Sequence, residues 1–434
     1  MISPKIRYFL IGTGIVAFAV AAPIFVLFVK GVKYDFGQKR FLPTGILTVK
    51  ADPEDAQIFL DGKLVRQTPG TIRFLSPKTY DLSLEKAGYF PWKKKFTVWP
   101  NEVVWASPPG EKVFLLANDP APQTLQTEIA DFLLFPGGYA VLTSEELKIY
   151  KNGKLEISQK LPRELNVFSS SADFRYFILN NKNNTGSPIF VYDSLLKKFY
   201  DLSPLFPSQT DEPKLEFDSQ NLLFALSGNN LFRVSLSPLH KDLLLGQVKD
   251  FTIFEKDIYN LTLKTQVLSL NSFDQNSGFN QKLFDTLPAF DSATLLVTPQ
   301  KSLYLIGDGA LYALSLDGLQ KSFDNVKETS SNFDATGLSL ISSAELWVIN
   351  GKNGASAFIT RSQMPFSQPQ ASQELGYAFT VADNKILAWE INREGEQNTY
   401  TLYTGLQIEK YIIQPDFRQA YVLDNGELKT FKLR

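Results

Sequence analysis

Cysteine is absent from this chain of 434 residues, and histidine occurs once. The absence of cysteine excludes a disulfide framework, a thiolate metal site and a cysteine nucleophile. A histidine-rich zinc or copper site is excluded too, and a catalytic triad would have to use His240. That residue lies in the stretch Ser237-Pro-Leu-His-Lys-Asp242, which is typical of a loop. We therefore expect His240 to be an exposed loop residue rather than a catalytic one.

An excess of positive charge is also missing. The chain has 44 basic and 45 acidic residues, which excludes the strongly basic balance of a general nucleic-acid binder. A hydrophobic content of 44% with 35 Phe and 17 Tyr indicates a folded chain and favours strands. The length suggests two or three domains. Residues 1–50 carry seven basic side chains and one acid, so residues 51–434 have a net charge of −7.

The basic N-terminal region surrounds a long apolar segment. From Tyr8 to Val29 the chain has 22 residues without charge, and a helix of that length spans roughly 33 Å, enough for a bilayer core. Tyr8 and Tyr34 lie near its two ends, where aromatic rings favour the interface. We expect residues 1–43 to form a transmembrane anchor, with its helix at about 8–29, and a basic juxtamembrane linker.

A cleaved signal peptide is the alternative. Lys5 and Arg7 would form its basic start, and Ala19-Val20-Ala21 resembles a cleavage site. The apolar run continues past that site to Val29, which a signal peptide does not need. The sequence therefore favours a retained anchor.

Residues 44–116 alternate between apolar and polar side chains. Ile46, Thr48 and Lys50 face one way and Leu47 and Val49 the other, as in a half-buried strand. Turn residues separate the runs, including the pairs Asp61-Gly62 and Thr68-Pro69. The pattern predicts a small antiparallel sandwich of short strands.

The order of these turn and core residues resembles the PEGA domain. The matching positions are Gly45, Leu47, Val49, Pro53, Ala56, Asp61-Gly62, Thr68-Pro69, Leu75, Tyr80, Lys86 and Gly88-Tyr89. Such domains occur in prokaryotic surface or envelope proteins. The resemblance implies a β-sandwich and an envelope setting, and it implies no catalytic residue because the shared positions are turns and core.

Two opposing arguments bear on which side of the membrane the body of the protein lies. Two basic residues precede the apolar segment and four follow it closely, which favours a cytoplasmic body. Long domains, however, translocate largely regardless of charge, and the PEGA-like segment resembles an exported domain. We expect an extracytoplasmic body on a single-pass cell-membrane protein.

Three tryptophans and a lysine run in the PEGA-like segment suggest a carbohydrate or lipid surface: Trp92, Trp99, Trp105 and Lys93–Lys95. The simpler interpretation is that the rings cover a small core and the lysines form a solvated strand edge that discourages pairing. We favour the simpler interpretation.

A Pro-rich linker at 117–130 precedes a long region, 131–434, in which short apolar runs recur every 35 to 45 residues. Each run is usually followed by a turn and a second run. A unit of this size cannot bury its own face and must stack on its neighbours. The pattern predicts a β-propeller of seven or eight blades. Two consecutive sandwiches are the alternative.

Turns in this region resemble the Ser-Pro-Asp-Gly-Arg turn of WD-like and Tol-type propellers. They are Ser171–Arg175, Gln414–Arg418 and the stretch that begins Phe217-Asp218. Phe174 and Phe417 stand where those propellers have glycine.

No common catalytic motif is present: no phosphate loop, dinucleotide fingerprint, Gly-x-Ser-x-Gly elbow or calcium loop. We expect no enzyme, no cofactor, no metal and no catalytic residue, and the sequence does not single out binding residues. The predicted function is binding or scaffolding at the cell envelope, with the membrane, an envelope protein or a glycan as partner and no nucleic acid. Two alternatives are a propeller enzyme that cleaves envelope glycan with two carboxylates, and a cytoplasmic-facing assembly factor.

Overall fold

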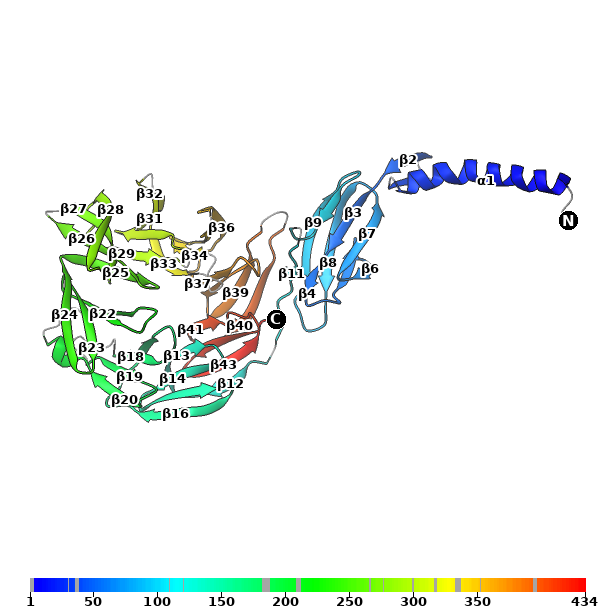
Figure 1. Cartoon of the computed structure of the whole chain (residues 1–434). Coiled ribbons are helices and arrows are strands. Elements are labelled where there is room, and N and C mark those ends of the chain that lie inside the picture. Colours follow the sequence, from blue (N-terminus) through cyan, green and yellow to red (C-terminus); the bar gives the residue numbers. More distant parts are fainter. Residues whose placement is uncertain are drawn as a thin grey trace. The chain divides into compact units, whose positions relative to one another are not determined.

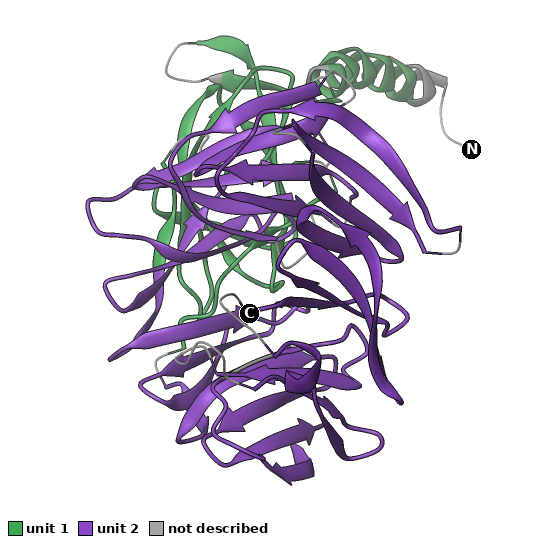
Figure 2. Ribbon diagram, turned by 90° about the vertical axis from the view of Figure 1, so that its left-hand side faces the viewer, with its two compact units in different colours: residues 1–119, 392–400, 434 green, residues 120–391, 401–433 purple. Residues whose placement is uncertain are grey.

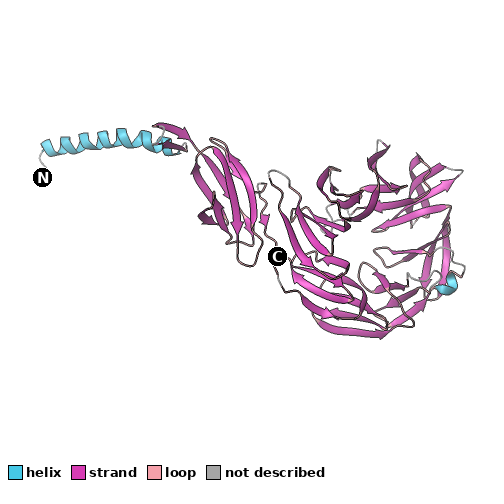
Figure 3. Cartoon of the chain, turned by 180° about the vertical axis from the view of Figure 1, so that it is seen from behind, coloured by secondary structure: helices cyan, strands magenta, loops and turns pink. Residues whose placement is uncertain are grey.

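A computed structural model describes the chain apart from residues 1–3, 30, 36–38, 109, 120, 182–187, 208–211, 265–266, 276, 299, 316–317, 332–336, 352 and 393–395. The described residues form one α-helix, one short 3-10 helix and otherwise strands (Figures 1 and 3). They divide into two compact units, which Figure 2 colours separately. The first comprises residues 1–119 with 392–400 and 434, and the second comprises 120–391 with 401–433.

Helix α1 (Pro4–Val29) is apolar on all sides after Arg7. Its window Phe9–Val26 has a mean hydropathy of 2.4 and no buried residue, so the helix is long and apolar enough to cross a membrane. The predicted span 8–29 lies within it, and the helix begins four residues earlier at Pro4, where proline suits a first turn. Exposed rings such as Phe18, at 73% exposure, would be unfavourably hydrated in water. A helix of this kind near the N-terminus indicates a membrane or secreted protein.

A short hairpin follows the helix. Strands β1 (Val32–Asp35) and β2 (Arg40–Pro43) pair antiparallel. The rings of Tyr34 and Phe41 meet edge to face, 5.1 Å apart between centroids. The segment predicted as a juxtamembrane linker therefore contains a hairpin.

Two sheets form the small domain that follows. One has the order β10-β3-β7, from β3 (Gly45–Val49), β7 (Gly70–Leu75) and β10 (Val103–Trp105). The other has the order β6-β5-β8-β9, from β5 (Gln57–Leu60), β6 (Lys63–Gln67), β8 (Lys78–Glu85) and β9 (Trp92–Val98). A small pair, β4 (Ala51–Asp52) and β11 (Val113–Phe114), completes it. The predicted sandwich is confirmed.

The prediction that all its strands pair antiparallel is wrong at two places. β10 pairs parallel with β3, and β11 pairs parallel with β4. Parallel neighbours need a long crossover, and here the four-stranded sheet supplies it between each pair.

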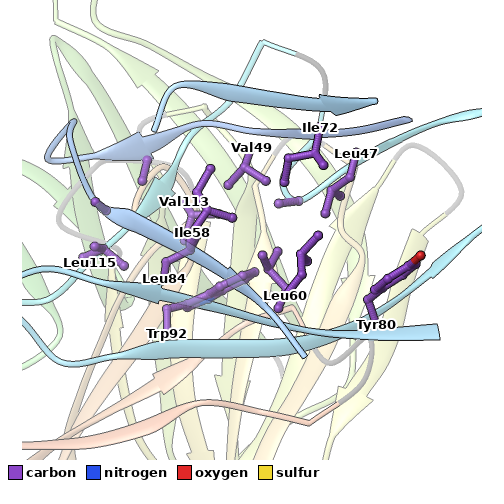
Figure 4. Close-up of a cluster of buried hydrophobic side chains, with 14 of the residues drawn as sticks. Leu47, Val49, Ile58, Leu60, Ile72, Tyr80, Leu84, Trp92, Val113 and Leu115 are labelled. Atoms are coloured by element: carbon purple, nitrogen blue, oxygen red, sulfur yellow. The ribbon is translucent and has the colours of Figure 1, made fainter. Parts of the chain in front are cut away.

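The core of this domain has the predicted alternation. Leu47 and Val49 are fully buried, whereas Thr48 and Lys50 are half-buried on the outer face. The two sheets enclose these residues with Ile58, Leu84 and Trp92 (Figure 4). Burying each such aliphatic side chain stabilises the fold by about 1.5–3 kcal/mol. The turn Asp61-Gly62 has φ angles of 48° and 75°, as its sequence predicted.

Eight four-stranded antiparallel sheets lie between Gln123 and Lys432 in the described residues, and they are the blades of a β-propeller. Within each of blades 1 to 7 the strands pair in chain order. Blade 1 contains β13 (Ile129–Phe135), β14 (Gly138–Thr143), β15 (Glu146–Lys151) and β16 (Lys154–Lys160). Blade 2 contains β17 (Val167–Ser170), β18 (Tyr176–Asn180), β19 (Phe190–Asp193) and β20 (Lys198–Asp201), and it is followed by η1 (Ser203–Leu205). Blade 3 contains β21 (Lys214–Phe217), β22 (Leu223–Ser227), β23 (Asn230–Leu236) and β24 (Leu239–Gly246), and blade 4 contains β25 (Val248–Phe254), β26 (Asp257–Lys264), β27 (Val267–Asp274) and β28 (Phe279–Leu287).

The next three blades continue this pattern. They are β29 (Ala293–Val297), β30 (Leu303–Gly307), β31 (Ala310–Ser315) and β32 (Gly318–Phe323); β33 (Val326–Ser331), β34 (Gly337–Ser342), β35 (Glu345–Asn350) and β36 (Ser356–Arg361); and β37 (Ser367–Ser372), β38 (Tyr377–Ala382), β39 (Lys385–Glu390) and β40 (Thr399–Thr404).

Blade 8 joins the two ends of this region. It contains β41 (Ile408–Ile413), β42 (Gln419–Asp424) and β43 (Glu427–Lys432), and its fourth strand is β12 (Gln123–Gln126) from the start of the region. The ring is thus closed by strand pairing between residues some 300 positions apart. Residues 123–126 fall in the stretch expected to be a linker. Of the predicted seven or eight blades, the described residues form eight.

Neighbouring blades pack face to face. Leu147 and Ile149 of blade 1 pack with Phe177 and Tyr192 of blade 2. Corresponding clusters of buried apolar side chains join other pairs of neighbouring blades in the described residues. Each sheet is therefore apolar on both faces, as the repeating apolar runs predicted.

The turns between first and second strands explain the missing glycines. Phe174 has a φ of 58° and Phe417 a φ of 59°, in the left-handed region that favours glycine. Phe174 packs against Phe135 of the preceding blade, with 5.2 Å between ring centroids, and Phe417 is buried. Packing of the ring offsets a backbone strain of about 1–2 kcal/mol.

Replacing Phe174 tests this balance. Phe174→Ala loses the ring and keeps the strain, whereas Phe174→Gly loses the ring but relieves the strain. We expect both variants to lower the free energy of unfolding, by about 2–3 kcal/mol for alanine and about 1 kcal/mol less for glycine. Urea denaturation of the full chain measures the difference. The matched control is Phe135, whose φ is not positive, where glycine should be worse than alanine. The same order at both positions would contradict the explanation.

Candidate binding surfaces

A cluster of hydrogen-bonded and ion-paired side chains lies in the propeller where blade 7 meets blade 8. The Tyr403 hydroxyl donates to Asp424 Oδ2 at 2.6 Å, and Lys429 Nζ lies 3.1 Å from the same carboxylate and 2.9 Å from Glu427. The backbone N–H groups of Leu406 and Gln407 donate to Asp424 Oδ1 at 2.8 Å. The side chain of Asp424 is 2% exposed.

Its electrostatics do not suit acid–base catalysis near neutral pH. Burial, together with the hydrogen bond to Asp424, raises the pKa of Tyr403 to about 12. Burial would lower the pKa of Lys429, but hydrogen bonds to Glu427 and Asp424 raise it instead. Both groups therefore stay protonated, whereas a general base needs a pKa near the working pH. The cluster holds two blades together.

His240 lies at the start of β24, beside a hairpin turn, rather than in a loop. Its Nδ1 is 3.0 Å from the Pro238 carbonyl oxygen, and its Nε2 is 3.3 Å from Asp242 Oδ2. The side chain is 48% exposed. Within the described part of the chain, no group of three or more His, Asp or Glu residues is placed to hold a metal ion.

The first strands of the blades carry polar side chains, and many of these bond neighbouring blades. Lys214 Nζ of blade 3 lies 2.9 Å from Asp250 Oδ1 of blade 4, and Asp250 Oδ2 accepts a hydrogen bond from the Leu295 N–H of blade 5 at 2.7 Å. Lys410 of blade 8 pairs in the same way with Asp131 of blade 1, at 2.6 Å. These groups form ion pairs and hydrogen bonds between blades. A ligand could bind them only by replacing those contacts.

The turns on one side of the propeller carry exposed apolar side chains. Because strands alternate in direction, the turns between third and fourth strands share a side with those between first and second strands. At the third-to-fourth turns of blades 2, 3 and 4 lie Leu195 (70% exposed), Leu196 (60%), Leu239 (36%) and Phe279 (63%), which we call the turn face. On the opposite side, Met364 (52% exposed) and Leu406 (74%) lie at connections between blades, and Leu263 (38%) and Val267 (40%) lie beside the second-to-third turn of blade 4.

The tryptophans and lysines of the small domain separate into different roles. Trp92 is 2% exposed in the core, as the simpler interpretation predicted, while Trp99 is 57% exposed. Lys94 is not the solvated residue expected from the sequence. It is 5% exposed, and its Nζ donates to the Asn392 carbonyl oxygen within the same compact unit, at 2.9 Å.

A groove of about 570 Å³ lies on the outer face of the same domain, beside β3, β6 and β7. Its charged lining consists of Lys50, Arg66 and Arg73, and no lining residue is acidic. The sequence does not reveal this basic groove, because its charged residues lie on or beside three different strands. The one available signal was the outward position predicted for Thr48 and Lys50.

The pKa of Asp424 gives a pH-dependent prediction. Burial alone would raise it, but hydrogen bonds from Tyr403, Lys429 and two backbone N–H groups lower it below its usual value. The folded state therefore binds this proton less readily than the unfolded state, whose pKa is about 3.9. The stabilisation is complete above that value and is lost as the pH falls below about 4.

Asp424→Asn should therefore lower the free energy of unfolding by about 1–3 kcal/mol at neutral pH. When the pH is lowered, the free energy of unfolding should fall less in this variant than in the wild type. Urea denaturation at neutral pH and at a pH of about 3 checks both. Asp242→Asn, at a side chain 64% exposed, is the control and should match the wild type at neutral pH. Equal acid losses in the Asp424 variant and the wild type would contradict the prediction.

Comparison with known proteins supports the two β-structured parts separately. Residues 44–109 match the PEGA domain family. A search of curated protein sequences gave no significant match.

Solved structures resemble the propeller in fold. The Dos1 propeller matches with a TM-score of 0.50 and 12% identity over 73% of this chain and 95% of its own. A eukaryotic initiation factor matches with a TM-score of 0.50 and 11% identity over 71% of this chain and 84% of its own. Porphyromonas gingivalis dipeptidyl peptidase 4 reaches a TM-score of 0.48 at 9% identity, over 69% of this chain and 56% of its own, which is too distant to carry an argument. The chain thus combines an N-terminal apolar helix, a PEGA domain at residues 44–109 and a β-propeller.

Proposed function

We propose that this protein is a single-pass membrane protein whose PEGA domain spaces an eight-bladed propeller from the outer side of the cell membrane, where the propeller binds an envelope partner. The domain limits that we propose are those of the sequence analysis: an anchor at 1–43, the PEGA domain at 44–116, a linker at 117–130 and the propeller at 131–434. The proposed mechanism is recognition without covalent chemistry.

The observation that carries the anchorage is the exposed surface of α1. Its 18-residue window Phe9–Val26 contains no residue buried in the protein. Apolar surface of this extent is stabilised by removal from water, at about 25 cal/mol per Å². A bilayer core provides that environment along the whole helix.

Single cysteines test anchorage and orientation together, because the chain has none of its own. We choose Ser3→Cys before the helix and Asp242→Cys on the propeller, where the side chain is 64% exposed. In spheroplasts, a membrane-impermeant maleimide should label Asp242→Cys and should label Ser3→Cys only after lysis. Both cysteines should be recovered in full-length chain from the membrane fraction.

Each other outcome has a definite meaning. Loss of residue 3 from the mature chain would show a cleaved signal peptide. The reverse labelling pattern would overturn the outward orientation and support the cytoplasmic-facing assembly factor.

The turn face supports partner binding. Four large apolar side chains at corresponding turns of three successive blades are exposed, although each blade buries apolar side chains elsewhere. Exposed apolar residues at the turns of a rigid scaffold are typical of binding surfaces.

Photo-crosslinking amino acids compare the two sides of the propeller. We expect residue-specific cross-links to an envelope protein or glycan from positions Leu195 and Phe279, and none from Met364 and Leu406. Cross-links only from the second pair would contradict the assignment of the turn face. Glycan cleavage by the purified full-length chain would support the alternative of a propeller enzyme.

A further inference from the structure

The basic groove of the PEGA domain has an unusual charge balance. Lys50, Arg66 and Arg73 line one depression of about 570 Å³. Arg66 and Arg73 are exposed and Lys50 is half-buried, so all three cations can reach a bound molecule. Like charges gathered around one hollow repel each other, and an anion bound between them removes that repulsion.

Two acidic side chains of this domain pair with lysines outside the groove. Asp61 pairs with Lys78 at 2.5 Å, and Glu54 pairs with Lys112 at 3.3 Å. Among the described residues, none of the three groove cations forms an ion pair. Positive charge therefore stays uncompensated in the groove.

Uncharged groups in the lining of the groove can bind a phosphate ester by hydrogen bonds. The hydroxyls of Thr48 and Thr71 lie 3.4 Å apart at the groove and can donate hydrogen bonds. Arg66 Nη1 lies 3.4 Å from the Thr71 carbonyl oxygen, which holds the guanidinium over the same strand. Guanidinium groups match the oxygens of a phosphate in pairs, and hydroxyls complete its coordination.

We propose that the basic groove binds the phosphodiester head groups of anionic lipids. The charge and hydrogen-bonding argument does not depend on the proposed anchorage, but the choice of lipid over a soluble phosphate does. Residues 30–44 join the end of α1 to β3, and the hairpin of β1 and β2 within them places Val32 opposite Pro43, so the domain follows the helix closely. A tethered groove meets head groups at a high effective concentration, so weak individual contacts suffice.

The test uses the full chain in a neutral maltoside detergent and needs no intact bilayer. The probe is dihexanoyl phosphatidylglycerol, and dihexanoyl phosphatidylcholine and inorganic pyrophosphate are compared with it. The groove variant is Lys50→Gln/Arg66→Gln/Arg73→Gln. Lys151→Gln/Lys154→Gln/Lys160→Gln, on blade 1, is the control because it removes the same charge from exposed positions.

We expect phosphatidylglycerol to bind the wild type and the control with dissociation constants within about twofold of each other. The groove variant should bind it about 100-fold more weakly, since each cation near an anionic head group contributes about a factor of five. Phosphatidylcholine should bind the wild type far more weakly than phosphatidylglycerol. Thermal unfolding of each variant confirms that the domain is intact.

Three results would overturn the proposal. They are unchanged binding in the groove variant, equal binding of the two lipids, and binding of pyrophosphate without binding of phosphatidylglycerol. The last would assign the groove to a soluble phosphate. Failure of the labelling experiment on anchorage would leave these binding constants unaffected, so the two proposals fail separately.

Discussion

Face-to-face packing of blades is the constraint on which the propeller depends. A four-stranded sheet of some 40 residues has two apolar faces, and it can bury both only between two neighbours. A row of such sheets leaves one apolar face uncovered at each end, and only a closed ring removes both ends. Pairing of β12 with β43 supplies that closure, because it places the beginning and the end of the region in one sheet. Closure requires each blade face to be apolar, and the ring of Phe174 contributes to such a face by packing on Phe135 of blade 1.

Because the blades pack together in a closed ring, buried polar groups lie where they can join neighbouring blades. Asp250 joins three successive blades, and Asp424 collects four donors where blades 7 and 8 meet. A buried carboxylate is stable only with such partners. The partners of Asp424 hold its pKa below the usual value, so this acid is a poor proton donor or acceptor near neutral pH. The exposed side chains of the turn face, in contrast, are not used to join blades.

The sequence predicted those parts of the fold that repeat or alternate. Apolar runs every 35 to 45 residues predicted the blades, and the alternation of Leu47 and Val49 with Thr48 predicted the sandwich core. Strand direction is not encoded by alternation, so the parallel pairing of β10 with β3 was missed. The stretch Gln123–Gln126 has no apolar pattern of its own, and only its pairing partner, far along the chain, makes it a strand. The basic groove was missed for the same reason, since Lys50, Arg66 and Arg73 become neighbours only when β3, β6 and β7 are assembled. Lys94 likewise owes its burial to a segment some 300 residues away.

The division of charge along the chain fits this arrangement. The first 50 residues are basic and the remainder is acidic, yet the PEGA domain keeps three uncompensated cations on its outer face. An acidic body is repelled by an anionic membrane surface within about a Debye length, roughly 8–10 Å in physiological salt. In the arrangement that we propose, the basic groove opposes that repulsion next to the anchor. The acidic charge of the propeller and the positive charge of the groove belong to different domains, so either can change without loss of the other.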